Sequence, residues 1–175
     1  MNNLIFYITW PYNYILHKTK LRDPYNVIDE KIILGSLPLK NNWPSISKKH
    51  SITHILSAVN DYEMKSFVVD EVYAKKHGIE YLRIGVRDFT GSPSNEEVDK
   101  ANKFIDTVEN GSTVYVHCKA GRTRSAYFVA GYLLRNGNCS LTDVVDFLSS
   151  KRPAIVFREC HMTALNSYIN SLKKE

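Results

Sequence analysis

Residues 113–134 contain the feature that most constrains how this chain can fold. A β-branched run, Thr113–Val116, leads into a short polar loop with Gly121 at its centre, and an apolar run from Ala126 to Leu134 follows. This order predicts a buried strand, a loop and a helix, in which the N–H groups of the loop and the helix N-terminus converge on one point. Such a point attracts anions, so the segment predicts a phosphate site within an α/β fold.

Two side chains give this loop the means to carry out chemistry. Cys118 is a weak nucleophile as a free thiol of pKa ~8.5, but a helix N-terminus and nearby cations can lower that pKa to ~3.5–7.5. Arg124 can bind two phosphate oxygens in a bidentate manner, which lysine cannot do. We therefore expect Cys118 to attack a bound phosphate and form a cysteinyl-phosphate. The plainer interpretation, a cysteine buried ahead of a helix, is disfavoured because Gly121, Arg122 and Arg124 stand beside it.

The rest of the loop is expected to hold the phosphate through backbone N–H groups or basic side chains. The predicted phosphate-binding residues are Lys119, Ala120, Gly121, Arg122, Thr123 and Arg124. His117 is expected to orient the loop and to lower the pKa of the thiol, or to be a structural histidine. Ser125 has two open roles, as a hydrogen-bond donor to the departing thiolate or only as a helix cap.

Hydrophobic periodicity places this segment in an alternating series of strands and helices. Strands are predicted over 27–34, 52–59, 79–86 and 113–116, and helices over 71–77, 94–110, 124–135, 141–150 and 159–172. Pro38 and Pro44 are expected to keep the stretch between the first two strands irregular. The series predicts an α/β fold with a central, mainly parallel sheet flanked by helices. Residues 23–175 are long enough to form one domain with a full core.

Polar segments follow three of the predicted strands. They are residues 60–63, 88–93 and 118–124. Ligands bind outside the carboxyl ends of the strands in such sheets, so these segments are expected to share one site. Expelling an alkoxide from phosphate needs a general acid, and the candidates are Asp88, Asp61 and Glu63. Asp88 could instead serve only the turn that it begins.

The first 22 residues differ from the rest of the chain. They contain no acidic residue, many apolar and aromatic side chains, and three basic residues near their end, Lys18, Lys20 and Arg22. The apolar run ahead of Pro11 is far shorter than the ~20 residues needed to span a bilayer. Basic residues follow that run instead of preceding it, which argues against a secretory signal. Residues 1–22 are therefore expected to be an interfacial anchor or a targeting segment, the alternative being a strand or helix that packs on the domain.

Composition limits the partners and the compartment. The net charge of +5 suits an anionic substrate or surface, but it does not by itself indicate a nucleic-acid binder, and no nucleic-acid partner is expected. Cys118, Cys139 and Cys160 show neither metal-binding spacing nor an even disulfide framework. We expect no metal, no cofactor, a monomeric chain and a reducing intracellular compartment.

The stretch His117-Cys118-x-x-Gly121-x-x-Arg124-Ser125 resembles the HCxxGxxR[S/T] signature of the cysteine-based protein tyrosine phosphatase superfamily. A closer resemblance, to a mitochondrial lipid-phosphatase branch of the dual-specificity type, rests on residues 33–39, 61–63, 88–93 and 114–126. That branch dephosphorylates phosphatidylglycerophosphate on the way to cardiolipin. The resemblance implies a dual-specificity-phosphatase-like sandwich over residues 23–175, with Asp88 as the general acid, because the superfamily carries its acid on this loop.

The same resemblance, which covers roughly residues 24–170, implies an anionic phospholipid substrate and a mitochondrial location at the inner membrane. An interfacial segment over residues 1–22, as its composition predicts, would hold the site at the membrane surface. Lys119 and Arg122 fit a head group with more than one phosphate, or form only a solvated basic rim. Asn60 stands where the branch has an acid, and His161 stands where a glutamine is expected. Both departures concern substrate details, not phosphatase chemistry.

Two other functions use the same residues. One is a dual-specificity protein phosphatase, which would act on phosphotyrosine, phosphoserine or phosphothreonine with the same chemistry. The other is a non-catalytic phosphate-binding adaptor, which is disfavoured because the nucleophile, the arginine and candidate acids are all present.

Overall fold

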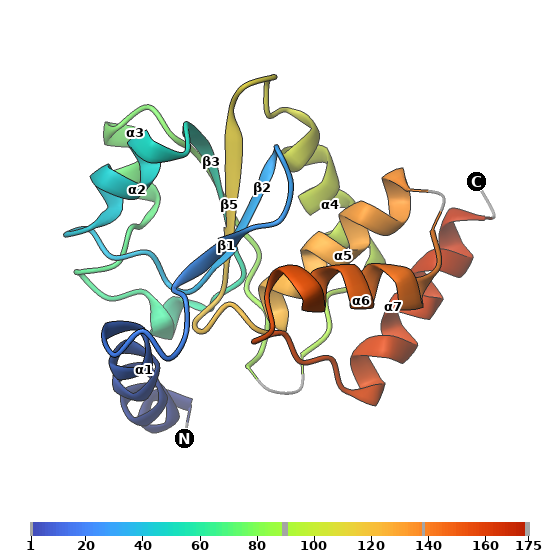
Figure 1. Ribbon diagram of the computed structural model, residues 1–175, viewed down its shortest axis with the longest axis horizontal. Helices are drawn as coiled ribbons and strands as arrows, with labels where there is room; N and C mark the ends of the chain where they lie inside the picture. The colour runs from blue at the N-terminus through green and yellow to red at the C-terminus, as the bar shows by residue number, and fades with distance from the viewer. Residues whose placement is uncertain (1, 89–90, 138, 174–175) are drawn as a thin grey trace.

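The centre of the molecule is a five-stranded sheet. The computed structural model describes the backbone of residues 2–88, 91–137 and 139–173, and the side chains of all of these except 2–6. The strands are β1 (Tyr25–Val27), β2 (Ile32–Gly35), β3 (Ile52–Ser57), β4 (Glu80–Arg83) and β5 (Thr113–His117). Their order across the sheet is β1-β2-β5-β3-β4; β1 is antiparallel to β2, and the other neighbouring pairs are parallel. The predicted α/β fold with a mainly parallel sheet is confirmed (Figure 1).

Helices cover both faces of this sheet. They are α1 (Asn2–Lys18), α2 (Trp43–Lys49), the 3-10 helix η1 (Asp61–Glu63), α3 (Glu71–Lys76), α4 (Asn95–Asp106), α5 (Arg124–Asn136), α6 (Leu141–Lys151) and α7 (Glu159–Leu172). Figure 1 shows α2 and α3 on one side of the sheet and α4 to α7 on the other. The sheet is therefore the middle layer of a sandwich.

Side chains that alternate along β2 and β5 build a core on each face of the sheet. Ile33 and Tyr115 belong to the core that includes Trp43 of α2. Leu34 and Val116, the next residues along, belong to the core under α4 to α7. Both central strands are thus buried on both faces, which explains their nearly continuous apolar sequences.

The predicted first strand is two strands. Between them, Oδ1 of Asp29 accepts hydrogen bonds from the backbone N–H groups of Lys31 (2.8 Å) and Ile32 (2.7 Å). This turn reverses the chain, so that β1 pairs antiparallel with β2. The prediction of a single strand over 27–34 is wrong because the short acidic side chain stabilises a turn in the middle of it.

The chain between β2 and β3 is more regular than the sequence predicts. The prolines favour irregular structure, yet Pro44 lies in the first turn of α2. Proline is tolerated there because the first N–H groups of a helix have no intrahelical partner and the fixed φ of proline suits a helix. The helix that begins after Ser94 is confirmed, with its capping box: Ser94 Oγ accepts the N–H of Glu97 (3.2 Å), and Glu97 Oε2 accepts the N–H of Ser94 (2.8 Å).

The N-terminal segment forms α1, which packs on the rest of the chain near η1 (Figure 1). The ring of Trp10 lies 4.9 Å from that of Phe67, and the Lys65 ammonium lies 4.9 Å from the ring of Tyr7. On the outer side, Ile8, Tyr12 and Ile15 are exposed at helical spacing. Among the described residues no helix has the length and apolar character needed to cross a membrane.

Candidate active site

Cys118 lies directly after β5, at the bottom of a cavity of about 220 Å³. Its thiol is buried, and burial alone would raise the thiol pKa. The charge of Arg124 and a hydrogen bond from Ser125 Oγ to Cys118 Sγ (3.3 Å) outweigh burial, together with hydrogen bonds from the backbone N–H groups of Ser125 and Arg122. The pKa of Cys118 is therefore lowered overall, which favours the nucleophilic thiolate.

The loop after Cys118 is held by a buried arginine that sequence reasoning missed. Nε of Arg152 donates to the carbonyl oxygen of Gly121 (2.6 Å), and its Nη2 donates to that of Ala120 (3.3 Å). In a trans peptide the N–H points away from the C=O. In the peptide between Gly121 and Arg122 the carbonyl faces Arg152, so the N–H of Arg122 points towards Cys118. No sequence pattern signalled this role, because Arg152 is distant in the chain and precedes a proline as an ordinary helix end would.

Gly121 has the backbone conformation that the loop needs. Its φ is +64°, and a Cβ at this position would lie 2.5 Å from the carbonyl carbon and oxygen of Gly35. Only glycine fits both the left-handed conformation and this close approach of two backbones. The predicted glycine-centred loop is thus explained by its contact with the end of β2.

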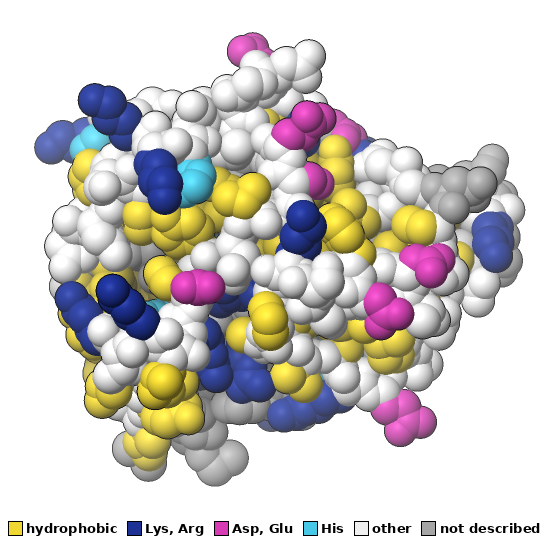
Figure 2. Space-filling model, viewed as in Figure 1, with side chains coloured by type: hydrophobic (Ala, Val, Ile, Leu, Met, Phe, Trp, Pro, Cys, Tyr) yellow, Lys and Arg dark blue, Asp and Glu magenta, His cyan; other side chains and the backbone are white. Residues whose placement is uncertain are grey.

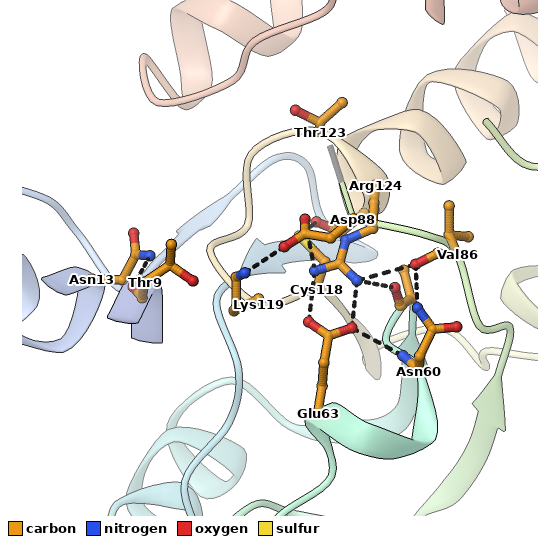
Figure 3. A network of polar contacts seen from close by, with 12 residues as sticks. Thr9, Asn13, Asn60, Glu63, Val86, Asp88, Cys118, Lys119, Thr123 and Arg124 are labelled. Carbon is orange, nitrogen blue, oxygen red and sulfur yellow. Dashed lines mark hydrogen bonds and ion pairs between the residues drawn. The ribbon is translucent and has the colours of Figure 1, made fainter. Parts of the chain in front are cut away.

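Arg124, at the start of α5, is fixed by the buried carboxylate of Glu63. Nη1 lies 2.6 Å from Glu63 Oε2, and Nη2 lies 2.9 Å from Glu63 Oε1 (Figure 3). Nη1 also donates to the carbonyl oxygens of Ala58 (3.3 Å) and Val86 (3.1 Å). Burial alone would lower the pKa of Arg124, but its hydrogen bonds with Glu63 and the charges of Cys118, Glu63 and Asp88 raise it. Glu63 does not line the cavity, so its contact with the reacting phosphate would run through Arg124.

Asn60 supports this pair from the same segment. Its backbone N–H donates to Glu63 Oε2 (3.1 Å), and its side-chain amide donates to the carbonyl oxygen of Val86 (2.8 Å). The carbonyl of Val86 therefore serves the site and not the sheet. This is one reason that β4 ends at Arg83, earlier than the predicted strand 79–86.

Asp88 lines the cavity beside Cys118. One of its carboxylate oxygens lies 3.2 Å from Arg124 Nη2, and the other pairs with Lys119 Nζ (Figure 3). The structure thus brings together the residues predicted as nucleophile, phosphate-binding arginine and general acid. Residues 89 and 90 of the predicted loop 88–93 lie outside the described part of the chain.

Two predicted supporting residues have different places. Asp61 pairs with Arg83 through a side chain that is 91% exposed, and it does not line the cavity. His117 is buried, and burial and the charge of Arg124 lower its pKa to about 3, although the hydrogen bond with the backbone oxygen of Cys118 acts in the opposite direction. It is therefore neutral near pH 7, and a lowering of the thiol pKa by His117 stays a prediction. Its contact with the backbone oxygen of Cys118 (3.2 Å) agrees with the expected orienting role.

Besides Asp88 and Gly91, three other parts of the chain form the walls of the cavity. The signature loop contributes Cys118, Lys119, Ala120, Arg122, Thr123 and Arg124; α1 contributes Thr9, Tyr12 and Asn13; the segment that leads into α7 and its first turn contribute Val156, Arg158 and His161. Sequence reasoning missed the α1 wall and Arg158, because nothing in the sequence says that residues so distant converge. Figure 2 shows Lys and Arg side chains gathered near the lower edge of the molecule, between α1 and the helices α6 and α7.

Within the described residues no group of three or more His, Cys, Asp or Glu side chains is placed to hold a metal ion. Cys118, Cys139 and Cys160 are free thiols. The groups that line the site are a thiol, a carboxylate, cations and backbone donors. These groups suit nucleophilic attack on a phosphate ester.

Comparison with known proteins agrees with this geometry. Residues 32–171 match the family described as "Dual specificity phosphatase, catalytic domain". The chain belongs to this family. The match begins at β2 and extends almost to the end of α7, so α1 and β1 lie outside it.

The names of several similar proteins describe phosphatases of a phospholipid. This phosphatase is 33% identical over 148 residues to "Phosphatidylglycerophosphatase and protein-tyrosine phosphatase 1" of Mus musculus, covering 84% of this chain and 77% of the relative. It is 31% identical over 168 residues to "Phosphatidylglycerophosphate phosphatase PTPMT1" of Arabidopsis thaliana, covering 94% of this chain and 48% of the relative. A crystal structure of PTPMT1 in complex with PI(5)P matches with a TM-score of 0.82 and 31% identity, over 87% of this chain and 98% of that one.

Proposed function

We propose that this phosphatase converts phosphatidylglycerophosphate into phosphatidylglycerol through a cysteinyl-phosphate intermediate. The observation that carries the proposal is the cavity: a thiol of lowered pKa at its floor, two arginines of the signature loop and one lysine around it, and Asp88 as the one carboxylate among the described lining residues. Such a site favours a phosphorylated, strongly anionic head group. The printed names of the mouse and Arabidopsis relatives support this choice of lipid.

In the first step, the Cys118 thiolate attacks phosphorus while the bond from phosphorus to the glycerol oxygen breaks. Arg124 and the loop N–H groups bind the equatorial oxygens, where charge gathers. Asp88 gives its proton to the departing alkoxide. In the empty site Asp88 pairs with Lys119 and Arg124. A bound phosphate would replace Asp88 as the anion beside these cations, so that Asp88 can turn towards the leaving oxygen.

In the second step, water attacks the cysteinyl-phosphate and the sulfur–phosphorus bond breaks. The Asp88 carboxylate takes the proton from this water, so the acid of the first step becomes the base of the second. Cys118 leaves as a thiolate, and Ser125 Oγ already donates a hydrogen bond to its sulfur. The donor role of Ser125 is favoured over a cap, because no side-chain cap hydrogen bond is present at the start of α5.

We propose that α1 holds this phosphatase at a membrane surface, where a lipid phosphate is reached. The exposed Ile8, Tyr12 and Ile15 form an apolar stripe, and Lys18 and Lys20 follow at its end. Such a helix lies in the membrane interface, with additional attraction from anionic lipids. The proposal includes a mitochondrial location at the inner membrane, which rests on the resemblance of residues 33–39, 61–63, 88–93 and 114–126 to the mitochondrial lipid-phosphatase branch.

A dual-specificity protein phosphatase is the second candidate, because the names of the mammalian relatives include "protein-tyrosine phosphatase". The test is kcat/KM on phosphatidylglycerophosphate in vesicles against kcat/KM on phosphotyrosine and phosphothreonine peptides. We expect the lipid value to be higher, with no turnover by the Cys118→Ser variant on any substrate. A higher peptide value would replace the lipid proposal, and no phosphate release from a small aryl phosphate by the intact protein would support the adaptor.

A further inference from the structure

A second pair of basic side chains, Arg122 and Arg22, lies at the cavity or next to its lining residues, apart from the buried Lys119 and Arg124. Arg122 lines the cavity, and its Nε donates to the carbonyl oxygen of Ala154 (2.9 Å). This contact fixes the plane of the guanidinium while leaving its two Nη groups without a hydrogen-bond partner among the described residues. Arg122 is therefore an oriented donor within the signature loop.

Arg22, at the end of the N-terminal segment, is hydrogen-bonded to a residue that lines the cavity, although Arg22 does not line it in the empty site. Its Nη1 donates to Oδ1 of Asn13 (2.9 Å), and Asn13 lines the cavity with its amide fixed on the carbonyl oxygen of Thr9 (2.7 Å). The backbone N–H of Arg22 donates to the carbonyl oxygen of Leu16 (3.2 Å), which ties the residue to the end of α1. The end of α1 thus holds an arginine next to Asn13 of the cavity wall.

The two guanidinium groups lie close enough to affect one another. The pKa of Arg22 is lowered, first by partial burial and then by the positive charge of Arg122. Among the described residues no carboxylate lies within ion-pair distance of either arginine, whereas Glu63 and Asp88 pair with the cations deeper in the cavity. Two partly buried like charges without a counter-charge are unfavourable, and a bound anion would relieve both the repulsion and the unpaired donors.

We propose that Arg22 and Arg122 form a second phosphate site, which binds the diester phosphate of the head group while its monoester phosphate lies against Cys118. The inference rests on the proposed function and adds the residue that recognises the second phosphate. Arginine suits this task because its planar donors bind phosphate oxygens in pairs. It also gives α1 a part in substrate recognition, beyond any part in holding the enzyme at a membrane.

The test uses two soluble substrates that differ in one phosphate. The deacylated head group of phosphatidylglycerophosphate carries a monoester and a diester phosphate, and glycerol 3-phosphate carries only the monoester. The measured quantity is the ratio of their kcat/KM values. We expect Arg22→Gln to lower this ratio about tenfold, mainly through KM of the two-phosphate compound, and Arg22→Lys to restore part of it. Lys20→Gln is the matched control, because it removes one positive charge two residues from Arg22, where the side chain is exposed and does not line the cavity. On these soluble substrates its ratio should stay within twofold of wild type.

Arg122→Gln tests the other half of the site without touching α1, and it should lower the same ratio. The fluorescence of Trp10, which packs on Phe67, reports whether α1 stays docked in the Arg22 variants. An unchanged ratio in both Arg22→Gln and Arg122→Gln would overturn the second site. So would an equal loss on both substrates, which would mean a purely structural role.

A further experiment with lipid vesicles distinguishes two sources of the bound phosphate, the diester of the substrate itself and the phosphates of neighbouring lipids. A loss with phosphatidylglycerophosphate in vesicles but not with the soluble head group would assign the site to phosphates of neighbouring lipids and overturn the substrate assignment. A different result would contradict the proposed function itself: a wild-type kcat/KM that is no higher for the two-phosphate compound or its lipid than for glycerol 3-phosphate. A wild-type preference that survives both substitutions would defeat only the second site.

Discussion

Arg124 contacts two carboxylates that differ in exposure and in partners. Glu63 is buried, faces both Nη groups and is further fixed by the backbone of Asn60. Asp88 lines the cavity, and its second oxygen pairs with Lys119. A group that must exchange protons with a leaving oxygen and with water needs access to both, which Asp88 has and Glu63 lacks. Replacing Asp88 and replacing Glu63 are therefore expected to have different effects on activity and stability.

Asp88→Asn is expected to remove the general acid. On an alkyl phosphate, kcat should fall by about 10²–10⁴, because an alkoxide leaves poorly without a proton. On an aryl phosphate with a phenol of low pKa the fall should be much smaller, since such a phenolate leaves unaided. Steady-state kinetics on both substrates measures the difference, and equal losses would mean that Asp88 only shapes the loop.

Glu63→Gln is expected to disturb both stability and phosphate binding. Removing one partner of a buried ion pair leaves the charge of Arg124 poorly compensated. This should lower the free energy of unfolding by about 3 kcal/mol. For a chain of this size that corresponds to a Tm lower by roughly 6–12 °C. kcat/KM should fall by at least about tenfold on alkyl and aryl phosphates alike, because the guanidinium loses its orientation.

Asp61→Asn is the matched control for Glu63→Gln, since both residues lie on η1 and Asp61 is exposed. Its unfolding free energy should stay within about 0.5 kcal/mol of wild type. A Glu63→Gln protein of unchanged Tm that loses activity only on alkyl phosphates would instead identify Glu63 as the acid.

At the scale of elements, three loops at the carboxyl ends of β3, β4 and β5 form the reacting centre, and α1 closes one side of it. The loops are tied to one another by buried ion pairs through Arg124. α1 is attached differently, by aromatic contacts and by a partly buried histidine, His17, whose Nε2 has no hydrogen-bond partner among the described residues. This weaker attachment makes the position of α1 sensitive to conditions that leave the sheet intact.

The docking of α1 is expected to weaken as pH falls. Burial and then the charges of Arg152 and Arg22 lower the pKa of His17 to about 4, against a smaller opposite effect of Asp23. When α1 is undocked, His17 takes up a proton near its ordinary pKa of 6.5. When α1 is docked, His17 takes up a proton only near pH 4. Protonation therefore favours the undocked helix between these two pH values. Trp10 fluorescence should therefore shift between about pH 6.5 and 4, while His17→Gln should flatten the shift. A shift that persists in His17→Gln would trace the effect to another group.

The sequence predicted the elements that depend on short-range patterns, and it did so for physical reasons. The β-branched run of β5, the capping box at Ser94 and the loop around Gly121 each follow from residues close together in the chain. The early turn at Asp29 and the helix at Pro44 differ from prediction because a single side chain had two possible local roles.

At the scale of the whole molecule, the reacting residues were predictable and the walls around them were not. Cys118, Arg124 and Asp88 lie on segments that a parallel sheet brings to one edge, so their convergence follows from topology. Arg152, Arg158 and the α1 wall depend on the packing of distant elements, which periodicity does not encode. The general chemistry is thus local in the sequence, whereas the shape that selects a substrate belongs to the assembled fold.

The α1 wall has a consequence for how the protein matures. A targeting segment is usually regarded as an address that is discarded after delivery, with no effect on the enzyme that remains. Here Thr9, Tyr12 and Asn13 are part of the cavity, and Arg22 is attached to them. Cleavage after residue 22 would therefore produce an enzyme with the same nucleophile and a wider, less basic entrance, so proteolytic processing would act as a change of specificity.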